Sequence, residues 1–536
     1  GRKVTLRFAE TLQSNGELAT ANLRDAKVTD VYTLKGEGEE VWQPSFTYHG
    51  FRYVEITNYP GQPLIEDFSG MVVYDDLRTT GHFHTSNSLI NKIYQNAFWG
   101  VSGNYKGIPV DCPQRNERMP WLGDRAVSSY SESFIFDNAN LYEQCLNNIE
   151  QSQTEKGVIP DVAPAFWKYY TDDITWPSTY FQVADMLYHQ YGEVRPIKKH
   201  YSSMKKWVNH IREKYMDHYL IPKDKYGDWC MPPKHIELIH AKDSSRITNG
   251  TLLATAYYYH ILRLMNKFAG LLNKPSDAKH YEQLAEKIRK AFNQKYLDKN
   301  TGEYDNNTVT ANLLPLYFGI TPDRYKDKVF KNMTDQIVSV YDKHISTGTL
   351  GTQMIMRGLT RFGRPDLAYS IVSTKTYPGW GYMVENGATT IWELWNGNKA
   401  NQWMSSRNHV MLLGDLVVWL YEDVAGIRSD DENPGYKRII MKPMITDSLQ
   451  YVNASYHSIH GLIKSDWHKT NHSFHWTISI PGNTSAIVSI PSKSAQTIQE
   501  NGENISKVKG VKLLKKEKGF VTLKVGSGNY SFKSAL

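Results

Sequence analysis

The chain has 536 residues, of which 40% are hydrophobic and 22% are charged, and its formal net charge at pH 7 is +7. This composition is typical of a globular protein with a sizeable core, and the length favours about two to four domains. Lysines and arginines are scattered, and the densest run, Lys507 to Lys518, lies in a strand-like stretch, so we expect no nucleic-acid partner. No apolar run approaches the roughly 20 residues of a membrane-spanning helix, so we expect no membrane span.

The three cysteines are Cys112, Cys145 and Cys230. They form neither a disulfide framework nor the spacing of a zinc site. The chain begins with GRKVTLRF, already inside a strand-like pattern, and shows no signal peptide. We therefore expect this sequence to be a fragment that further residues precede.

Aromatic residues make up 12% of the chain, with 35 Tyr and 14 Trp. Their rings combine a flat apolar face with a polar edge, which suits stacking on sugar rings. Large folds also use aromatic residues as core, and composition alone favours this second explanation.

Residues 1–82 alternate between apolar and polar side chains in short runs. Such runs occur at Val4–Phe8, Val28–Tyr32 and Phe51–Ile56, with turn residues between them. Short alternating strands with frequent turns predict an N-terminal β-sandwich.

Residues 83–427 change to a helical pattern. An apolar stripe with three- and four-residue steps begins at Leu89, and Asn87 is the expected N-cap. Further helices are expected at 252–271, 277–293 and 408–424. At ordinary lengths about a dozen helices fit in this domain. A closed toroid of paired helices, an (α/α) barrel, would accommodate them, although periodicity does not distinguish a barrel from a solenoid.

Residues 428–536 return to strand-like alternation, for example in Ser473–Ile478 and Ala486–Ile490. This pattern predicts a second β-sandwich. The fold class expected from the sequence is therefore multidomain, with an all-α domain between two β-sandwiches. Because no low-complexity linker separates the three stretches, we expect the domains to dock against one another.

The segment Asp111–Asp124, DCPQRNERMPWLGD, concentrates charged groups in a short loop. Three acids, two arginines and a tryptophan lie within it, and its prolines and glycine break regular structure. Loops on a rigid scaffold often hold functional groups. The alternative is a solvated turn whose charges pair with one another.

A second segment places Glu393 between Trp392 and Trp395. Apolar rings around a carboxyl raise its pKa, which suits acid–base catalysis. The alternative is a surface glutamate between two core tryptophans.

Two further clusters mix aromatic rings with carboxylates, at Trp167–Pro177 and Tyr226–Trp229. Rings stack on sugar faces and aspartates accept hydrogen bonds from hydroxyls, although tryptophans more often serve as core. His409 begins one of the expected helices. The chain contains no G-x-S-x-G elbow, phosphate-binding loop, H-E-x-x-H or paired C-x-x-C motif. Two separated carboxylates in aromatic surroundings favour cleavage of a glycosidic bond, with the sugar left open.

These segments together resemble the bacterial α-L-rhamnosidases of glycoside hydrolase family 78. The signature loop of that family is roughly D-C-P-x-R-D-E-R-x-x-W-x-G-D, which Asp111 to Asp124 matches closely. The family stretch G-A-T-T-[IL]-W-E-R-W matches Gly387 to Trp395. The family's S-x-N-H motif matches Ser406 to His409. The N-terminal domain and the segment Pro434–Ile439, which leads into the C-terminal domain, are also typical of the family. The resemblance covers essentially the whole chain and implies an (α/α)6 barrel flanked by N-terminal and C-terminal β-sandwiches.

The resemblance also assigns the chemistry. It places the general acid on Glu117 and the general base on Glu393, with Glu385 as the second choice for the base. The acid protonates the departing oxygen and the base activates water on the opposite face, which inverts the anomeric centre and requires carboxyls about 6.5–9.5 Å apart.

The remaining family positions imply substrate binding. Asp111, Arg115 and Asp124 correspond to the groups that bind rhamnose hydroxyls. The resemblance implies that Trp121, Trp176 and Trp229 form aromatic walls of the binding site. It also implies that His409 lies in this site. An apolar wall suits rhamnose because its C6 is a methyl group.

The sequence departs from the family pattern at Asn116, at Met119–Pro120 and at Leu394. These changes lie beside the expected catalytic residues and delete none of them. They can alter the outer contacts of the binding site, and with them the aglycone preference and the sugar specificity. A helical-barrel hydrolase or lyase for another deoxy or acidic sugar, or an inactive glycan-binding protein, therefore remain as alternatives.

The expected substrate is a rhamnose-containing oligosaccharide, polysaccharide or plant glycoside. Two carboxylates suffice for this chemistry, so we expect no cofactor and no metal. By analogy with the family, a periplasmic or secreted location is expected. The sequence leaves the natural glycan and the oligomeric state open.

Overall fold

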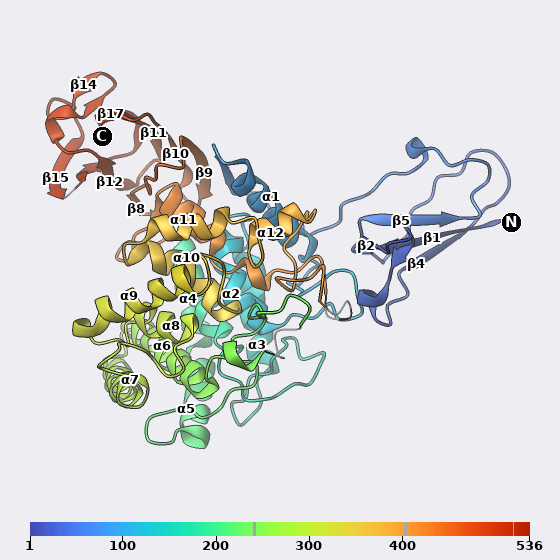
Figure 1. Ribbon diagram of the computed structural model, residues 1–536, viewed down its shortest axis with the longest axis horizontal. Helices are drawn as coiled ribbons and strands as arrows, with labels where there is room; N and C mark the ends of the chain where they lie inside the picture. The colour runs from blue at the N-terminus through green and yellow to red at the C-terminus, as the bar shows by residue number, and fades with distance from the viewer. Residues whose placement is uncertain (239–242, 401–402, 404, 518) are drawn as a thin grey trace.

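The computed structural model describes residues 1–238, 243–400, 403, 405–517 and 519–536 (Figure 1). A small N-terminal sheet lies on one side of the molecule, helices fill the centre, and a β-rich C-terminal region lies on the far side (Figure 1). Among these residues, no helix is both long enough and apolar enough to cross a membrane. Lys518, the end of the densest basic run, lies outside the described residues. A helical domain between two β-sheet domains confirms the coarse architecture expected from the sequence.

The N-terminal domain is built on a three-stranded antiparallel sheet with the order β4-β1-β5. Phe8, Leu23 and Val28 form a small core of their own beneath it. Burial of alternate apolar residues explains why the alternating runs form strands here. The strands of this domain are Lys3–Ala9 (β1), Thr11–Leu12 (β2), Leu18–Ala19 (β3), Thr29–Thr33 (β4) and Tyr53–Thr57 (β5).

The central domain is helical. Asn87 caps the first helix as expected, because its side chain accepts hydrogen bonds from the backbone amides of Leu89 and Ile90. The expected helices at 252–271 and 277–293 are confirmed as α6 and α7, which pack against each other. In chain order the helices are Ser88–Gly103 (α1), Leu122–Ser133 (α2), Ala139–Ser152 (α3), Thr179–Tyr191 (α4), Arg195–Tyr215 (α5), Gly250–Leu271 (α6), Pro275–Tyr296 (α7), Val309–Tyr317 (α8), Asp323–Ser339 (α9), Thr349–Arg361 (α10), Pro365–Ser373 (α11), Trp380–Glu385 (α12) and Leu416–Trp419 (α13).

The expectation of one helix over 408–424 is wrong. A 3-10 turn at Met411–Leu413 is followed by α13, which continues as a π-helix over Leu420–Val424. Gly414 separates the two parts with a φ of 52°, and a Cβ there would lie 2.9 Å from the carbonyl oxygen of Thr352. A left-handed residue held against another backbone breaks a helix that the apolar pattern alone would continue.

The C-terminal region contains two sheets. One has seven strands in the order β14-β13-β17-β11-β10-β9-β6, and the other has five in the order β15-β16-β12-β8-β7. The strands are Gly81–Thr85 (β6), Ile427–Ser429 (β7), Arg438–Met441 (β8), Tyr451–Ser458 (β9), Gly461–Lys469 (β10), Ser473–Ile480 (β11), Ser485–Pro491 (β12), Gln499–Glu500 (β13), Glu503–Asn504 (β14), Val511–Glu517 (β15), Phe520–Val525 (β16) and Gly528–Ala535 (β17). Strand β6, which contains the expected boundary at residue 82, precedes the helices in the chain but pairs with β9.

The helical domain and the C-terminal sheets share one continuous apolar core. Polar contacts reinforce this junction: Trp467 Nε1 donates to the carbonyl oxygen of Val424 at 3.2 Å, and Ser465 Oγ donates to that of Ala425 at 2.7 Å. The expected docking of the domains is therefore observed at this junction.

Candidate active site

The loop between α1 and α2 is folded back on itself by Asp111. Its backbone amide donates to the carbonyl oxygen of Met119 at 2.9 Å, and its Oδ1 accepts from the Met119 amide at 2.6 Å. The side chain of Asp111 is 1% exposed. Burial raises the pKa of Asp111 to about 7, and the negative charge of Glu117 adds to the effect.

Arg115 joins two carboxylates from distant parts of the chain. Its Nη1 donates to Glu393 Oε2 at 2.9 Å and its Nη2 to Glu393 Oε1 at 3.2 Å, a bidentate contact. The same Nη2 lies 2.7 Å from Glu117 Oε2 and 3.7 Å from Asp111 Oδ2. The Arg115 side chain is 2% exposed, so the guanidinium is a buried cation shared by three acids.

Glu117 is held at both of its oxygens. Trp121 Nε1 donates to Oε1 at 2.9 Å, while Oε2 faces Arg115 and also accepts from Arg24 Nη1 at 2.8 Å. The Glu117 side chain is 10% exposed, against 6% for Glu393. Of the two glutamates, Glu117 is therefore the one nearer to solvent.

Glu393 is buried between two segments of irregular backbone. Its amide donates to the carbonyl oxygen of Ser406 at 3.0 Å, and its Oε2 accepts from the Ser406 amide at 2.8 Å. Together with the two bonds from Arg115, this contact fixes the orientation of the Glu393 carboxylate. The neighbouring rings of Trp392 and Trp395 are buried in the core.

Asp124 and His409 face each other beside this group, with Asp124 Oδ1 4.0 Å from His409 Nδ1. Asp124 lies in the first turn of α2, and burial together with the charge of Asp111 raises its pKa well above the ordinary value. Burial and the nearby cation of Arg115 lower the pKa of His409 to about 3. His409 is therefore a neutral imidazole at physiological pH, suited to hydrogen bonding with a hydroxyl.

The three tryptophans expected in the wall are connected through Tyr226. Its ring stacks on Trp176 with centroids 4.4 Å apart, and meets Trp121 and Trp229 edge-on, each at 6.2 Å. Tyr226 is held in turn by its hydroxyl, which donates to Asp161 Oδ2 at 2.7 Å. The rings form one assembly that reaches Glu117 through Trp121.

Local backbone features place two of these rings. Gly123 leaves room for Trp176, because a Cβ at this position would lie 2.1 Å from the indole ring. Trp229 follows Asp228, whose carboxylate accepts from the amides of Gly348 at 2.8 Å and Leu350 at 2.9 Å. These amides lie at the N-terminus of α10, so a helix cap fixes the segment that carries Trp229.

Seven of the nine site residues expected from the sequence are thus linked by contacts, and the other two, Asp124 and His409, pair with each other within reach of the charges of Asp111 and Arg115. Glu385, the second choice for the base, lies elsewhere: it is exposed and pairs with Lys375 Nζ at 2.9 Å. Of the departures from the family pattern, Asn116 is exposed, while Leu394 is 2% exposed and belongs to the core.

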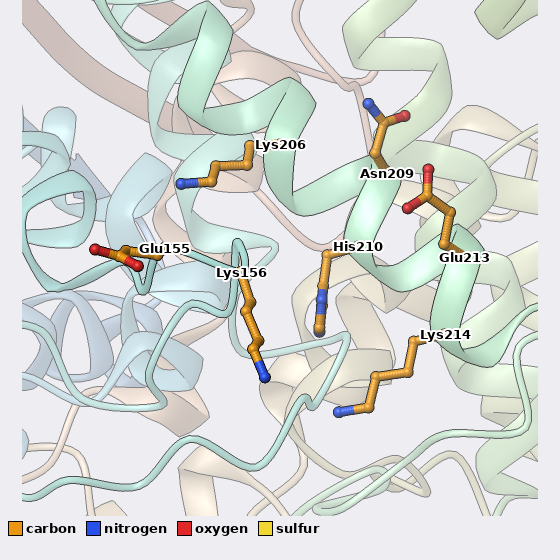
Figure 2. A pocket seen from close by; sticks show the side chains of 7 residues that line it. All are labelled: Glu155, Lys156, Lys206, Asn209, His210, Glu213 and Lys214. Carbon is orange, nitrogen blue, oxygen red and sulfur yellow. The ribbon is translucent and has the colours of Figure 1, made fainter.

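A charged surface hollow lies apart from this group, between the turn at Glu155–Lys156 and one face of α5 (Figure 2). Two of its residues, His210 and Lys214, pair with Asp172 at 3.0 Å and 2.7 Å. Asp172 precedes Trp176 in the chain, so these contacts tie the segment that carries that ring to α5. None of the nine expected site residues lines the hollow.

The sequence did not point to two residues of the N-terminal domain that reach the site. Arg24 contacts Glu117, and Glu10 accepts a hydrogen bond from the backbone amide of Arg407 at 3.0 Å, next to the Ser406 amide that binds Glu393. Arg24 is 93 positions from Glu117 and lies in no motif. An isolated charged residue in a strand-rich stretch carries no signal of such a contact.

Three side chains that could bind a metal ion lie beside the guanidinium of Arg115. Potential ligand atoms of Asp111, Cys112 and Glu117 lie within 4.8 Å of one another, close enough for a metal ion. Arg115 Nη2 already contacts both carboxylates of this set, so the guanidinium supplies the positive charge there. Two glutamates bridged by a buried arginine, beside stacked rings, can bind a sugar and exchange protons with it.

Comparison with known proteins identifies the family of each part of the chain. Residues 78–424 match the bacterial alpha-L-rhamnosidase 6 hairpin glycosidase domain. Residues 1–74 match the bacterial alpha-L-rhamnosidase concanavalin-like domain, and residues 426–504 match the C-terminal domain of the same family.

Individual relatives extend this match. An alpha-L-rhamnosidase of Streptomyces avermitilis is 33% identical over 99% of this chain and 49% of the relative. A solved alpha-L-rhamnosidase of Dictyoglumus thermophilum superposes with a TM-score of 0.93 at 38% identity, over 100% of this chain and 59% of that one. The Streptomyces avermitilis alpha-L-rhamnosidase complexed with L-rhamnose superposes with a TM-score of 0.92 at 33% identity, over 99% and 50%.

The chain spans about half the length of the curated relatives it matches. Within that span the family models cover the N-terminal, helical and C-terminal domains in chain order. The resemblance inferred from the sequence motifs is thereby confirmed. The chain belongs to the bacterial alpha-L-rhamnosidase family.

Proposed function

We propose that this protein is an inverting glycoside hydrolase that releases terminal α-L-rhamnose from glycans or glycosides. The observation that carries the proposal is the buried guanidinium of Arg115, which bridges Glu117 and Glu393 beside a wall of tryptophans. Family membership supports the sugar, and the Streptomyces avermitilis relative was solved with L-rhamnose bound.

In this mechanism Glu117 is the general acid. Its Oε1–H bond breaks as the proton moves to the glycosidic oxygen, and the C1–O bond breaks with its electron pair going to the leaving group. Glu117 suits this role because it is the more exposed of the two glutamates and so lies on the side where a leaving group can depart. A positioned acid of this kind contributes about 10²–10⁴-fold to the rate.

Glu393 is the general base. It takes a proton from a water molecule whose oxygen bonds to C1 on the face opposite the leaving group, which inverts the anomeric configuration. Arg115 and the Ser406 amide hold this carboxylate in one orientation.

The remaining site residues bind the sugar. Asp111, Asp124 and Arg115 offer acceptors and donors to the rhamnose hydroxyls, and neutral His409 adds one more polar contact. Trp121, Trp176 and Trp229 form the apolar wall for the ring and its C6 methyl group. The support is their connection into a single group around Tyr226 and Glu117.

The finer architecture is also part of the proposal. We infer an (α/α)6 barrel for the helical domain, supported by neighbouring helix pairs such as α6 with α7 and α10 with α11, and by the six-hairpin description of the matching family model. We infer β-sandwiches at both ends, with boundaries near residues 82 and 427. For the C-terminal one, contacts of β12 with β11 and β17 bring its two sheets together.

The substrate class is a rhamnose-containing oligosaccharide, polysaccharide or plant glycoside, and the proposed location is the periplasm or the exterior of the cell. The test is hydrolysis of 4-nitrophenyl α-L-rhamnoside followed by proton NMR. Initial release of the β anomer of rhamnose supports the proposal, and initial release of the α anomer contradicts inversion. No release from this substrate or from rhamnose-containing oligosaccharides, with binding retained, would identify a glycan-binding protein instead.

A further inference from the structure

Arg24 is the residue of the N-terminal domain that reaches the proposed general acid. Its Nη1 donates to Glu117 Oε2 at 2.8 Å, and its Nε donates to the carbonyl oxygen of Trp403 at 3.4 Å. The side chains of Arg24 and Glu117 are 20% and 10% exposed, so the pair is shielded but open to solvent on one side. A charge-assisted contact in such a setting is stronger than a surface ion pair.

The backbone around Arg24 is held in an unusual conformation. Arg24 follows the 3-10 helix Ala21–Leu23 with φ 56° and ψ −121°, a region that residues with a Cβ rarely adopt. Backbone strain of this kind persists only when surrounding contacts enforce it. Here the preceding Leu23 is buried in the small N-terminal core, which anchors the turn.

The other contacts of this turn join it to the helical domain. Asn22 Nδ2 donates to Glu10 Oε2 at 2.7 Å and to the carbonyl oxygen of Ser405 at 3.3 Å. Glu10 Oε2 in turn accepts from the Arg407 amide at 3.0 Å. The strained turn is therefore docked against the 405–407 segment, whose Ser406 amide binds Glu393.

We propose that Arg24 is a positioning residue for Glu117, so that the N-terminal domain completes the active site. This inference rests on the proposed function. Arg24 and Arg115 both face Oε2 of Glu117, which favours negative charge on that oxygen. The proton is then carried by Oε1, whose other lone pair accepts from Trp121 Nε1. As the proton leaves Oε1 for the glycosidic oxygen, the two cations stabilise the carboxylate that forms.

A residue that strengthens the acid matters most when the leaving group is poor. Nitrophenolate departs with little protonation, whereas an alkoxide or a sugar hydroxyl needs nearly full proton transfer. Removal of Arg24 should therefore slow alkyl and disaccharide rhamnosides more than nitrophenyl rhamnoside. A merely structural role would lower all of these rates by the same factor.

The test compares Arg24→Ala, Arg24→Lys and the unchanged protein on α-L-rhamnosides with nitrophenyl, phenyl and methyl leaving groups. We expect Arg24→Ala to lose about tenfold or more in kcat/KM on the methyl rhamnoside and under about threefold on the nitrophenyl rhamnoside, with partial rescue by Arg24→Lys.

The matched control is Arg7→Ala, because Arg7 lies in the same domain but away from Glu117. Among the described residues, its one ion pair is an exposed contact with Glu55. This variant should leave every rate unchanged. An equal loss on all leaving groups in Arg24→Ala would overturn the role of Arg24 alone. If the unchanged protein cleaves none of these rhamnosides, the proposed function itself fails and this inference fails with it.

Discussion

Arg115 holds Glu393 through both of its terminal nitrogens, at 2.9 Å and 3.2 Å, although the two residues are 278 positions apart in the chain. The same guanidinium contacts Glu117, so one buried cation sets the relative positions of the two proposed catalytic carboxylates. Any change that moves this guanidinium should disturb both proton transfers together.

Arg115→Lys should abolish most activity while the protein still folds. A lysine keeps the charge but replaces the planar fork with one ammonium, which cannot make the bidentate contact and reach Glu117 together. We expect a fall of about 100-fold or more in kcat/KM on nitrophenyl rhamnoside, measured on protein whose folding is verified by circular dichroism.

The matched control for that change is Arg357→Lys. Arg357 also bridges two carboxylates, Asp415 at 2.7 Å and Glu422 at 2.8 Å, but lies outside the proposed site. It should lower the melting temperature and leave kcat/KM nearly unchanged. Similar activity in both variants would contradict the special role of Arg115.

Glu393→Gln should lose activity and Glu385→Gln should retain it. Glutamine preserves the shape of Glu393 but cannot accept the proton from water, so kcat should fall by about 100-fold or more. Glu385 is exposed and pairs with Lys375, which places it away from the Arg115 cluster. Steady-state kinetics of both variants decide the identity of the base, and the reverse pattern would assign it to Glu385.

Glu117→Gln should show the signature of a lost general acid. We expect a loss of about 100-fold or more on methyl rhamnoside and a smaller loss on nitrophenyl rhamnoside. Kinetics across the leaving-group series measure this. Equal losses on every leaving group would show that Glu117 does not act as the acid.

Gly123→Ala should weaken substrate binding by displacing Trp176. The added Cβ would lie 2.1 Å from the indole ring, so the ring has to move or α2 has to shift. Overpacking of this kind costs about 1–3 kcal/mol of stability, and KM should rise as the wall is distorted. Gly270→Ala is the control, because a Cβ there meets nothing within 4 Å. An unchanged KM in Gly123→Ala would remove Trp176 from the binding wall.

Glu10 should make the stability of the protein depend on pH. Burial raises the pKa of Glu10 from 4.5 to about 7 in the folded protein, while the unfolded chain keeps the ordinary value. Between these two pH values the folded state binds a proton that the unfolded state does not. The contribution to stability is therefore fully present below pH 4.5 and is lost as pH rises to about 7, a change on the order of 3 kcal/mol.

Glu10→Gln removes that titration and keeps an oxygen that can accept from Asn22 and the Arg407 amide. Melting temperatures of both proteins at pH 5 and pH 8 provide the measurement. The variant should gain stability relative to the unchanged protein as pH rises. A melting-temperature difference that is the same at both pH values would show that Glu10 does not titrate in this range.

Much of the architecture could be predicted from the sequence because local patterns decide it. Alternation and turn residues predicted strands at both ends, and three- and four-residue spacing predicted α1, α6 and α7. Where a single residue interrupts the pattern, prediction failed: Gly414 breaks the helix expected over 408–424, because its left-handed backbone lies against Thr352.

The candidate site also has a part that could be predicted from the sequence and a part that could not. The residues from Asp111 to Asp124 form a dense motif in one loop, so the sequence by itself determined that these groups lie together. Their partners come from elsewhere: Glu393 is 278 positions from Arg115, and Arg24 is 93 positions from Glu117. Such pairings depend on how whole domains pack, and sequence periodicity carries no information about that. Only the tertiary structure therefore decided that one arginine bridges both glutamates and that the N-terminal domain reaches Glu117.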